Sequence, residues 1–215
     1  MDHSSGVLYS LHGLPADRAD GGRLASNRER ILRAARDTVA ERGFRDAEIA
    51  AIAAAAGVAT GTIYRYFPSK ADLFAEVVST TSKQEVEVVA LIATSGGPAV
   101  QRLAEAVCVF ARRALSGRKL AYALVAEPME PEVDAARLAC RRALARVFEG
   151  VLADGIKAGE FPPQDIEASA ACLVGVLVEG LVGPLAPVPG AVDDGENLVE
   201  AIALFCLRAV SGKDE

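Results

Sequence analysis

Two short stretches of helical periodicity, separated by a tight turn and ended by a proline, leave this chain few possible folds. The first stretch, about residues 48–56, has an apolar face formed by Ile49, Ile52, Ala53 and Ala56. Gly57 can adopt a positive φ in the turn, and Val58 can fill the core behind it. The second stretch, about residues 60–66, ends because Pro68 cannot continue a helix. The pattern predicts a helix-turn-helix.

The rest of the chain also has helical periodicity, interrupted by Gly and Pro. Ser26 and Glu29 form a capping box that predicts a helix start at Ser26, and Gly43 predicts its end. Further helices are predicted at about residues 69–93, 98–115, 118–126, 131–158, 165–185 and 196–210. Alanine and leucine dominate and Trp is absent, which favours helix over sheet. The predicted fold is all-α: a three-helix head at residues 26–72, and a larger helical body at residues 73–215.

Charge is distributed unevenly along the chain. Residues 23–70 carry nine Lys and Arg against five Asp and Glu, a balance of +4, whereas residues 71–215 carry 13 against 21, a balance of −8. A basic segment on an acidic body suggests that one end faces a polyanion, although chance variation would also produce it. Residues 1–25, rich in Gly, Ser and Asp, are predicted to form a flexible arm.

Several functional classes are disfavoured by composition. The four cysteines form no CxxC pair, so we interpret them as reduced and buried, with a redox sensor as the alternative. Both His residues lie before residue 13, which disfavours a metal site, and no cofactor is expected. No export signal is visible, and the longest apolar run, residues 168–178, is too short for a bilayer and predicts a deeply buried helix. We expect a cytoplasmic protein without membrane contact.

The second short helix has the side chains needed to read DNA. Ile63 and Phe67 would anchor it, leaving Thr60, Thr62 and Arg65 outward, where small hydroxyls and an arginine can contact base edges in the major groove. Tyr64, Tyr66 and Lys70 would donate to phosphates, although the tyrosines could instead be core aromatics. The predicted DNA-binding residues are Arg28, Arg45, Glu48, Thr60, Gly61, Thr62, Tyr64, Arg65, Tyr66 and Lys70.

Residues 43–74, GFRDAEIAAIAAAAGVATGTIYRYFPSKADLF, resemble the helix-turn-helix of the TetR family of transcriptional regulators. The resemblance implies a DNA-binding head, a body that binds an unknown small-molecule effector, and a homodimer on double-stranded operator DNA. Glu48 departs from the family pattern, which usually has Thr or Ser there. A carboxylate facing DNA is repulsive, so we expect Glu48 to weaken nonspecific binding.

The resemblance places the effector among the helices of the body. The predicted ligand-binding residues are Phe110, Tyr122, Met129, Cys140 and Leu144, each of which could instead be ordinary core. The turn at residues 127–131 could be a mobile element that gates a pocket. The helices at residues 165–185 and 196–210 have long apolar faces that a monomer would leave wet, which predicts a dimer interface including Leu173, Leu177, Gly180 and Leu204. Glu179 on that face would need a partner such as Arg208 or water.

The function expected from these features is a ligand-released repressor. A helical enzyme is the alternative from another class, but the sequence has no nucleophile–base pair, phosphate loop or metal-ligand set. A binding module that has lost operator specificity is a third possibility, favoured only by Glu48.

Overall fold

The computed structural model describes residues 17–187 and 195–212, with side chains from residue 26 onward. Within these ranges the chain forms nine helices and no strand. The helices are α1 (Asp17–Arg42), α2 (Ile49–Ala56), α3 (Thr60–Tyr66), α4 (Lys70–Ala93), α5 (Ala99–Ser116), α6 (Arg118–Val125), α7 (Pro131–Ala158), α8 (Ile166–Leu185) and α9 (Gly195–Val210). The predicted all-α class is confirmed.

Most helix ends lie where local capping chemistry predicts them. The Ser69 hydroxyl accepts a hydrogen bond from the backbone N–H of Asp72 at 3.0 Å, and Asp165 accepts one from Ala168 at 2.9 Å. Gly57 and Gly159 end α2 and α7 with positive φ angles of 63° and 75°, a conformation that costs glycine little. These ends were predictable because each depends on side chains within one helical turn.

The predicted start of the first helix was wrong. α1 begins at Asp17, so Ser26 lies inside the helix instead of capping it, and the predicted arm is helical from residue 17. Residues 1–16 of that arm lie outside the described residues. Ile31, Ala35 and Val39 are buried on one face and anchor the helix. Extending an anchored helix backward adds a hydrogen bond for each residue ordered, so a capping pattern need not be used.

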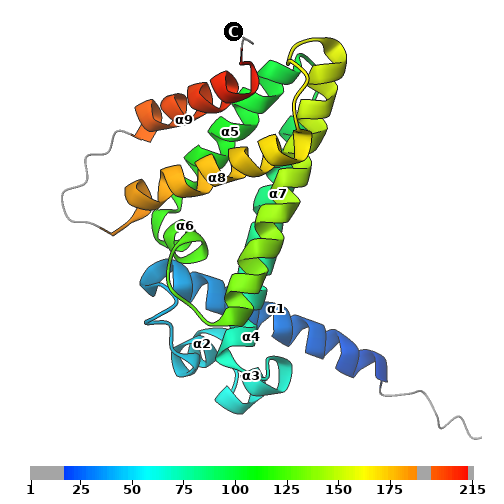
Figure 1. Cartoon of the computed structure of the whole chain (residues 1–215). Coiled ribbons are helices and arrows are strands. Elements are labelled where there is room, and N and C mark those ends of the chain that lie inside the picture. Colours follow the sequence, from blue (N-terminus) through cyan, green and yellow to red (C-terminus); the bar gives the residue numbers. More distant parts are fainter. Residues whose placement is uncertain (1–16, 188–194, 213–215) are drawn as a thin grey trace, which may run out of the picture.

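The head lies at one end of the molecule, and two long helices lead away from it (Figure 1). α1 to α3 form the head, and α4 and α7 pack along each other from the head into the body. α5 packs against both α4 and α9, and α8 crosses α7, so that α8 and α9 lie at the end of the body far from α3. Any signal between the ends must pass along α4, α6 or α7.

The buried apolar residues form two clusters, and the boundary between them does not follow the predicted division at residue 72. The head cluster includes Ala123 of α6 and Val133 of α7 as fully buried members. Leu120 and Leu124 of α6 also pack against it. The head therefore packs directly against part of the body, and α6 lies at this contact.

α8 is more apolar and less buried than expected. It is 20 residues long with a mean hydropathy of 1.8, so it is long and apolar enough to cross a membrane by length and composition alone. The apolar run predicted at residues 168–178 therefore lies within a longer apolar helix. Core helices of globular proteins meet the same criterion, and 33% of its apolar window is buried in the fold. The burial follows one face, which includes Ala170, Leu173 and Leu177.

Candidate DNA-binding surface and ligand cavity

α3 presents the face that the sequence predicted for reading DNA. Ile63 and Phe67 are buried in the head cluster, and Val58 packs against the same cluster from the turn. Thr60 and Arg65 are exposed, and Tyr64 is 48% exposed. Thr62 and Tyr66 are half-buried, and Tyr66 rests against the head cluster. This face can enter a major groove, with Tyr66 held at its edge.

The other predicted DNA-contacting residues lie around α3, and they differ in how far their side chains are held by contacts within the chain. Arg28 forms an ion pair with Glu76 at 2.9 Å and lies 5.3 Å from the centre of the Phe67 ring, so it is partly committed within the chain. Lys70 stacks its ammonium 5.2 Å from the Phe74 ring centre. Both cations would keep a preset position when DNA approaches.

The remaining three predicted positions are exposed. Arg45 follows α1, Gly61 lies on α3 with open space around it, and Glu48 is the N-cap residue of α2. The Glu48 side chain makes no capping hydrogen bond to the α2 amides. Its carboxylate is therefore left at the helix N-terminus without the capping role that a threonine would have there.

α1 orients the helix-turn-helix through Arg30, a residue that was not among the predicted site residues. Nη2 of Arg30 donates to the carbonyl oxygen of Ala56 at 2.5 Å and approaches that of Gly57 at 3.4 Å. A Cβ atom on Gly57 would lie 2.8 Å from the same nitrogen. Glycine is required in this turn both for its positive φ and for the close approach of Arg30.

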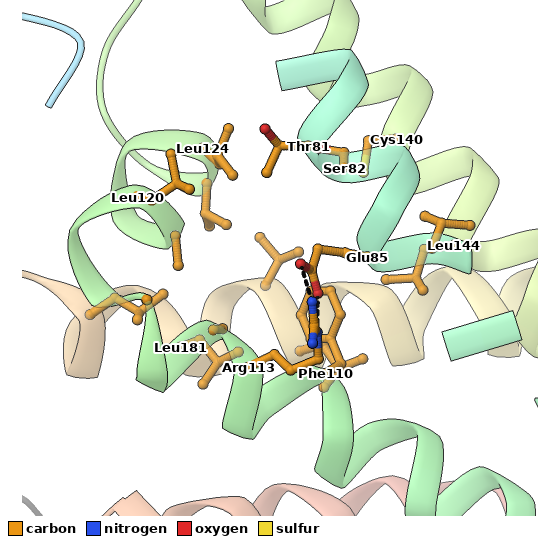
Figure 2. Close-up of a pocket in the computed structure, with 18 of the residues that line it drawn as sticks. Thr81, Ser82, Glu85, Phe110, Arg113, Leu120, Leu124, Cys140, Leu144 and Leu181 are labelled. Atoms are coloured by element: carbon orange, nitrogen blue, oxygen red, sulfur yellow. Dashed lines mark hydrogen bonds and ion pairs between the residues drawn. The ribbon is translucent and has the colours of Figure 1, made fainter. Parts of the chain in front are cut away.

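A cavity of about 370 Å³ lies in the body among α4, α5, α6, α7 and α8 (Figure 2). Aliphatic side chains form a large part of its wall, and those from α6 and α8 include Leu120, Leu124, Val178 and Leu181. Its volume is within the range typical of small-molecule sites, about 300–1,000 Å³. A largely apolar wall with few polar groups selects an apolar ligand.

Three of the five predicted ligand-binding residues line this cavity. Phe110, Cys140 and Leu144 contribute to the wall, whereas Tyr122 and Met129 do not. Met129 packs against the head cluster, and Tyr122 packs against the body core. Periodicity shows that such residues are buried, but the packing of the helices against one another decides which space they face.

Thr81 is a polar member of the wall that was not among the predicted ligand-binding residues. The residue is 4% exposed, and its hydroxyl oxygen has no hydrogen-bond partner in the described chain. Figure 2 shows the side chain reaching from α4 toward Leu124 on α6. A buried hydroxyl without a partner is costly, so it favours a ligand that supplies an acceptor or donor.

An ion pair and a thiol also line the cavity. Arg113 holds Glu85 through two hydrogen bonds of 2.6 and 2.8 Å, which raise the pKa of the Arg113 guanidinium (Figure 2). Burial raises the pKa of the Cys140 thiol, against the lowering effects of Ser82 and Arg141. The thiol therefore stays protonated at neutral pH, which gives the wall a neutral surface there.

Arginines outnumber acidic residues around the cavity. Arg36 of α1 and Arg141 of α7 line it and are exposed, and neither forms an ion pair with another described residue. Arg137 is 9% exposed and donates to the carbonyl oxygens of Ala123, Leu124 and Glu127 at 2.6–2.9 Å. The exposed pair can bind an anionic group at the rim, because guanidinium groups match phosphate and carboxylate geometry.

The predicted dimer interface needs correction. Leu173 and Leu177 are buried in the chain's own core, and Leu177 also lines the cavity, so they cannot contact a partner. Periodicity identified α8 as apolar but could not distinguish its two sides. Gly180 is exposed, with space for a Cβ 3.5 Å from Ile202. Leu204 is 47% exposed.

α8 and α9 carry apolar side chains on the surface, as α4 does at Leu91 and α7 at Leu138. Phe205 on α9 is 59% exposed beside Leu204, and Cys172 and Gly175 on α8 are exposed. Glu179 is also exposed on α8, and within the described ranges no ion pair joins it to Arg208. In the same ranges no group of three or more His, Cys, Asp or Glu side chains could hold a metal ion.

Two family models match successive parts of the chain. Residues 31–77 match the family described as "Bacterial regulatory proteins, tetR family". Residues 96–179 match "Tetracyclin repressor-like, C-terminal domain". The fatty acid metabolism regulator protein of Bacillus subtilis (strain 168) is 26% identical over 132 residues, which cover 60% of this chain and 68% of that protein. The matched segments include α3 and most of the residues that line the cavity.

Solved structures with the same fold bind chemically different ligands. The transcriptional regulator FadR from Bacillus subtilis, in complex with stearoyl-CoA, matches with a TM-score of 0.70 and 23% identity over 86% of this chain and 98% of that one. RolR, in complex with resorcinol, matches with a TM-score of 0.69 and 23% identity over 90% and 91%. At these identities the likeness concerns the fold, and the cavity itself must indicate the ligand.

Proposed function

Because this chain belongs to the tetR family of bacterial regulatory proteins and is a ligand-responsive, DNA-binding transcriptional regulator, we propose that it represses its target genes until a long-chain acyl group enters the cavity. We infer the ligand class from the aliphatic wall of the cavity and the exposed arginines at its rim. We assign DNA reading to α3 and its surroundings in residues 26–72, and effector binding to residues 73–215, with Arg36 of α1 added at the rim of the cavity.

The DNA part of the proposal is supported by the exposed face of α3. Thr60 and Arg65 would contact base edges, and Tyr64, Tyr66 and Lys70 would donate to phosphates. The protein would act as a homodimer, because Leu204 and Phe205 leave apolar surface exposed on α9. Two α3 helices would then lie about one DNA turn apart, roughly 34–36 Å, over a near-palindromic operator. A protein that binds an operator would act in the cytoplasm.

The acyl part of the proposal is supported by the chemistry of the wall. Methylene groups would replace water against Leu120, Leu144 and Leu181, and each buried CH₂ contributes about 0.8 kcal/mol. The unpartnered Thr81 hydroxyl would donate to the carbonyl oxygen of a thioester or carboxylic acid. The sequence relative named as a fatty acid metabolism regulator supports the same ligand class.

The phosphates of an acyl-CoA would bind at the rim. Arg36 and Arg141 are exposed and not ion-paired within the described chain, so they can each make charge-assisted hydrogen bonds to phosphate. Resorcinol, the ligand named for one structural relative, has no anionic group and would use neither arginine. Binding of the two compounds therefore separates the two ligand classes.

The DNA assignment is tested by selecting an operator from random DNA with the full-length protein and measuring binding across a salt series. Tyr64→Phe and Lys70→Ala should each weaken binding several-fold, and Lys70→Ala should reduce the salt slope by about one phosphate contact. Lys83→Ala, an exposed cation on the far part of α4, is the matched control. Unchanged affinity in both head variants would overturn the contact assignment.

The ligand assignment is tested by titrating stearoyl-CoA, stearic acid and resorcinol into the protein by calorimetry. Stearoyl-CoA should bind most tightly and release the operator. Arg141→Ala should weaken stearoyl-CoA more than stearic acid, whereas Arg142→Ala, its exposed neighbour outside the cavity, should change neither. Tighter binding of resorcinol than of stearoyl-CoA would overturn the proposed ligand class.

A further inference from the structure

A single carboxylate joins the body to the head. Oε2 of Glu127 accepts a hydrogen bond from the backbone N–H of Phe44 at 2.9 Å, and Oε1 accepts one from Arg45 at 2.8 Å. Glu127 directly follows α6, whereas Phe44 and Arg45 lie between α1 and α2. Charge-assisted hydrogen bonds of this kind are about twice as strong as neutral ones. The link therefore connects two segments 82 residues apart in sequence.

The head is shaped to receive this carboxylate. Gly43 has a φ of 79°, and a Cβ atom built on it would lie 3.0 Å from Oε2 of Glu127. A side chain at residue 43 would therefore be strained by its backbone and would also press on the carboxylate. Phe44 itself is fully buried in the head cluster, so its backbone position is coupled to the packing of the whole head.

α6 lies between the cavity and the head. Leu120 and Leu124 line the cavity and also pack against the head cluster, so they contact both. At the start of α6, Nζ of Lys119 donates to the carbonyl oxygen of Glu41 on α1 at 3.2 Å. At its end, Arg137 holds the carbonyl of Glu127 at 2.6 Å. A change in the position of α6 would therefore displace α1 through Lys119 at the start of α6, and the α1–α2 junction through Glu127 at its end.

We propose that Glu127 is the positioning residue that transmits occupancy of the cavity to the head. This inference rests on the proposed function, because it assumes that filling the cavity shifts α6. Leu120 and Leu124 would receive the displacement, and the Glu127 carboxylate would pull on Phe44 and Arg45, which precede α2. The recognition helices would then no longer match the operator spacing. Without the carboxylate, a ligand would still bind and α6 would still move, but the α1–α2 junction would follow less, because only the Lys119 hydrogen bond and the apolar contacts of α6 would remain.

The substitution Glu127→Gln removes the link with little change of shape. A glutamine side chain has one acceptor oxygen, and its NH₂ group would face the second backbone N–H. Glu130→Gln is the matched control, because Glu130 lies in the same turn, is exposed and makes no capping hydrogen bond to α7. Both variants remove one negative charge, so a difference between them reports the hydrogen bonds and not the charge.

The test uses full-length protein with the cavity filled by a side chain, so that it depends on no ligand. Ala121→Phe fills the cavity from α6, and Val178→Phe fills it from the opposite wall on α8 in case the first variant does not fold. Hydrogen exchange of the amides in residues 48–66 is then compared with and without the filling, in the background of Glu127, E127Q and E130Q. Filling should speed exchange about 5-fold or more with Glu127 and with E130Q. In E127Q the increase should be much smaller.

The outcomes separate coupling from a merely structural role. A structural role predicts faster exchange in E127Q with the same response to filling, and that result would overturn the proposal. An absent response in every background would also overturn it. A second measurement compares operator affinity with and without stearoyl-CoA, where E127Q should bind the ligand normally but stay on DNA. If stearoyl-CoA fails to release the wild-type protein, the proposed ligand is wrong, and the exchange data still decide the role of Glu127.

Discussion

Arg30 on α1 and Ala56 at the end of α2 are joined by a hydrogen bond of 2.5 Å between Nη2 and the backbone carbonyl oxygen. The last carbonyl groups of a helix have no partner within the helix, so a cationic donor there also complements the helix dipole. The bond connects the long first helix to the turn before α3. The orientation of the DNA-reading helix therefore depends on a side chain that never needs to touch DNA.

Replacing Arg30 with Met should loosen this turn while preserving most of the side chain's apolar packing. We expect a loss of about 1–2 kcal/mol in the free energy of unfolding, since the site is partly buried and the donor is charged. This corresponds to a fall of about 2–8 °C in Tm for a chain of this size. Thermal unfolding of Arg33→Met, an exposed arginine on the same helix, is the control. Equal melting temperatures for the two variants would contradict the assigned role.

Glu48 should weaken DNA binding through charge repulsion. The residue is exposed at the N-terminus of α2 and makes no capping bond there. Glu48→Thr should tighten binding about 5-fold at low salt, the equivalent of about 1 kcal/mol, and the gain should shrink as salt screens the charges. The threonine should also cap α2 and raise stability by about 0.5–2 kcal/mol. An unchanged affinity and salt slope, measured by fluorescence anisotropy, would show that Glu48 does not face phosphate.

Thr81→Val should have opposite effects on the free protein and on ligand binding. Without ligand, the substitution removes a buried hydroxyl that has no partner, so Tm should stay the same or rise. With stearoyl-CoA, it removes one hydrogen bond, so affinity should fall about 5-fold. Thr80→Val is the control, because its hydroxyl already donates to the carbonyl of Glu76 at 2.7 Å. Undiminished affinity by calorimetry would remove Thr81 from the ligand contacts.

Cys206 should make the folded protein sensitive to alkaline pH. Burial raises the pKa of its thiol to about 11 from an ordinary value of 9.0, with a smaller contribution from Cys108. The folded state therefore holds a proton that the unfolded state loses above pH 9. The stabilisation from the protonated thiol is fully present below pH 9. The free energy of unfolding should then fall by about 1.4 kcal/mol per pH unit between pH 9 and 11. Chemical denaturation of Cys206→Val, which cannot titrate, should show a shallower decline over this range, and parallel curves would refute the assignment.

The ends of the helices follow from residues close to one another in the chain. Ser69 with Asp72, Pro131 at the first position of α7, and Gly57 and Gly159 with positive φ act within one turn of backbone. The exposed face of α3 was equally predictable, because Ile63 and Phe67 must turn inward and leave Thr60 and Arg65 outward. Such features need no knowledge of how helices pack against one another.

What only the tertiary structure decided is which side of each helix meets which neighbour. Leu173 and Leu204 are both apolar and on terminal helices, yet one is buried in its own chain and the other is 47% exposed. Thr81 became a candidate ligand contact, and Met129 lost that role, because helix crossing determines which residues face the cavity. The bond from Glu127 to Phe44 and Arg45 has no local signal at all. Helix periodicity sets what is buried, whereas contacts across 82 or more residues depend on crossing angles that no single segment encodes.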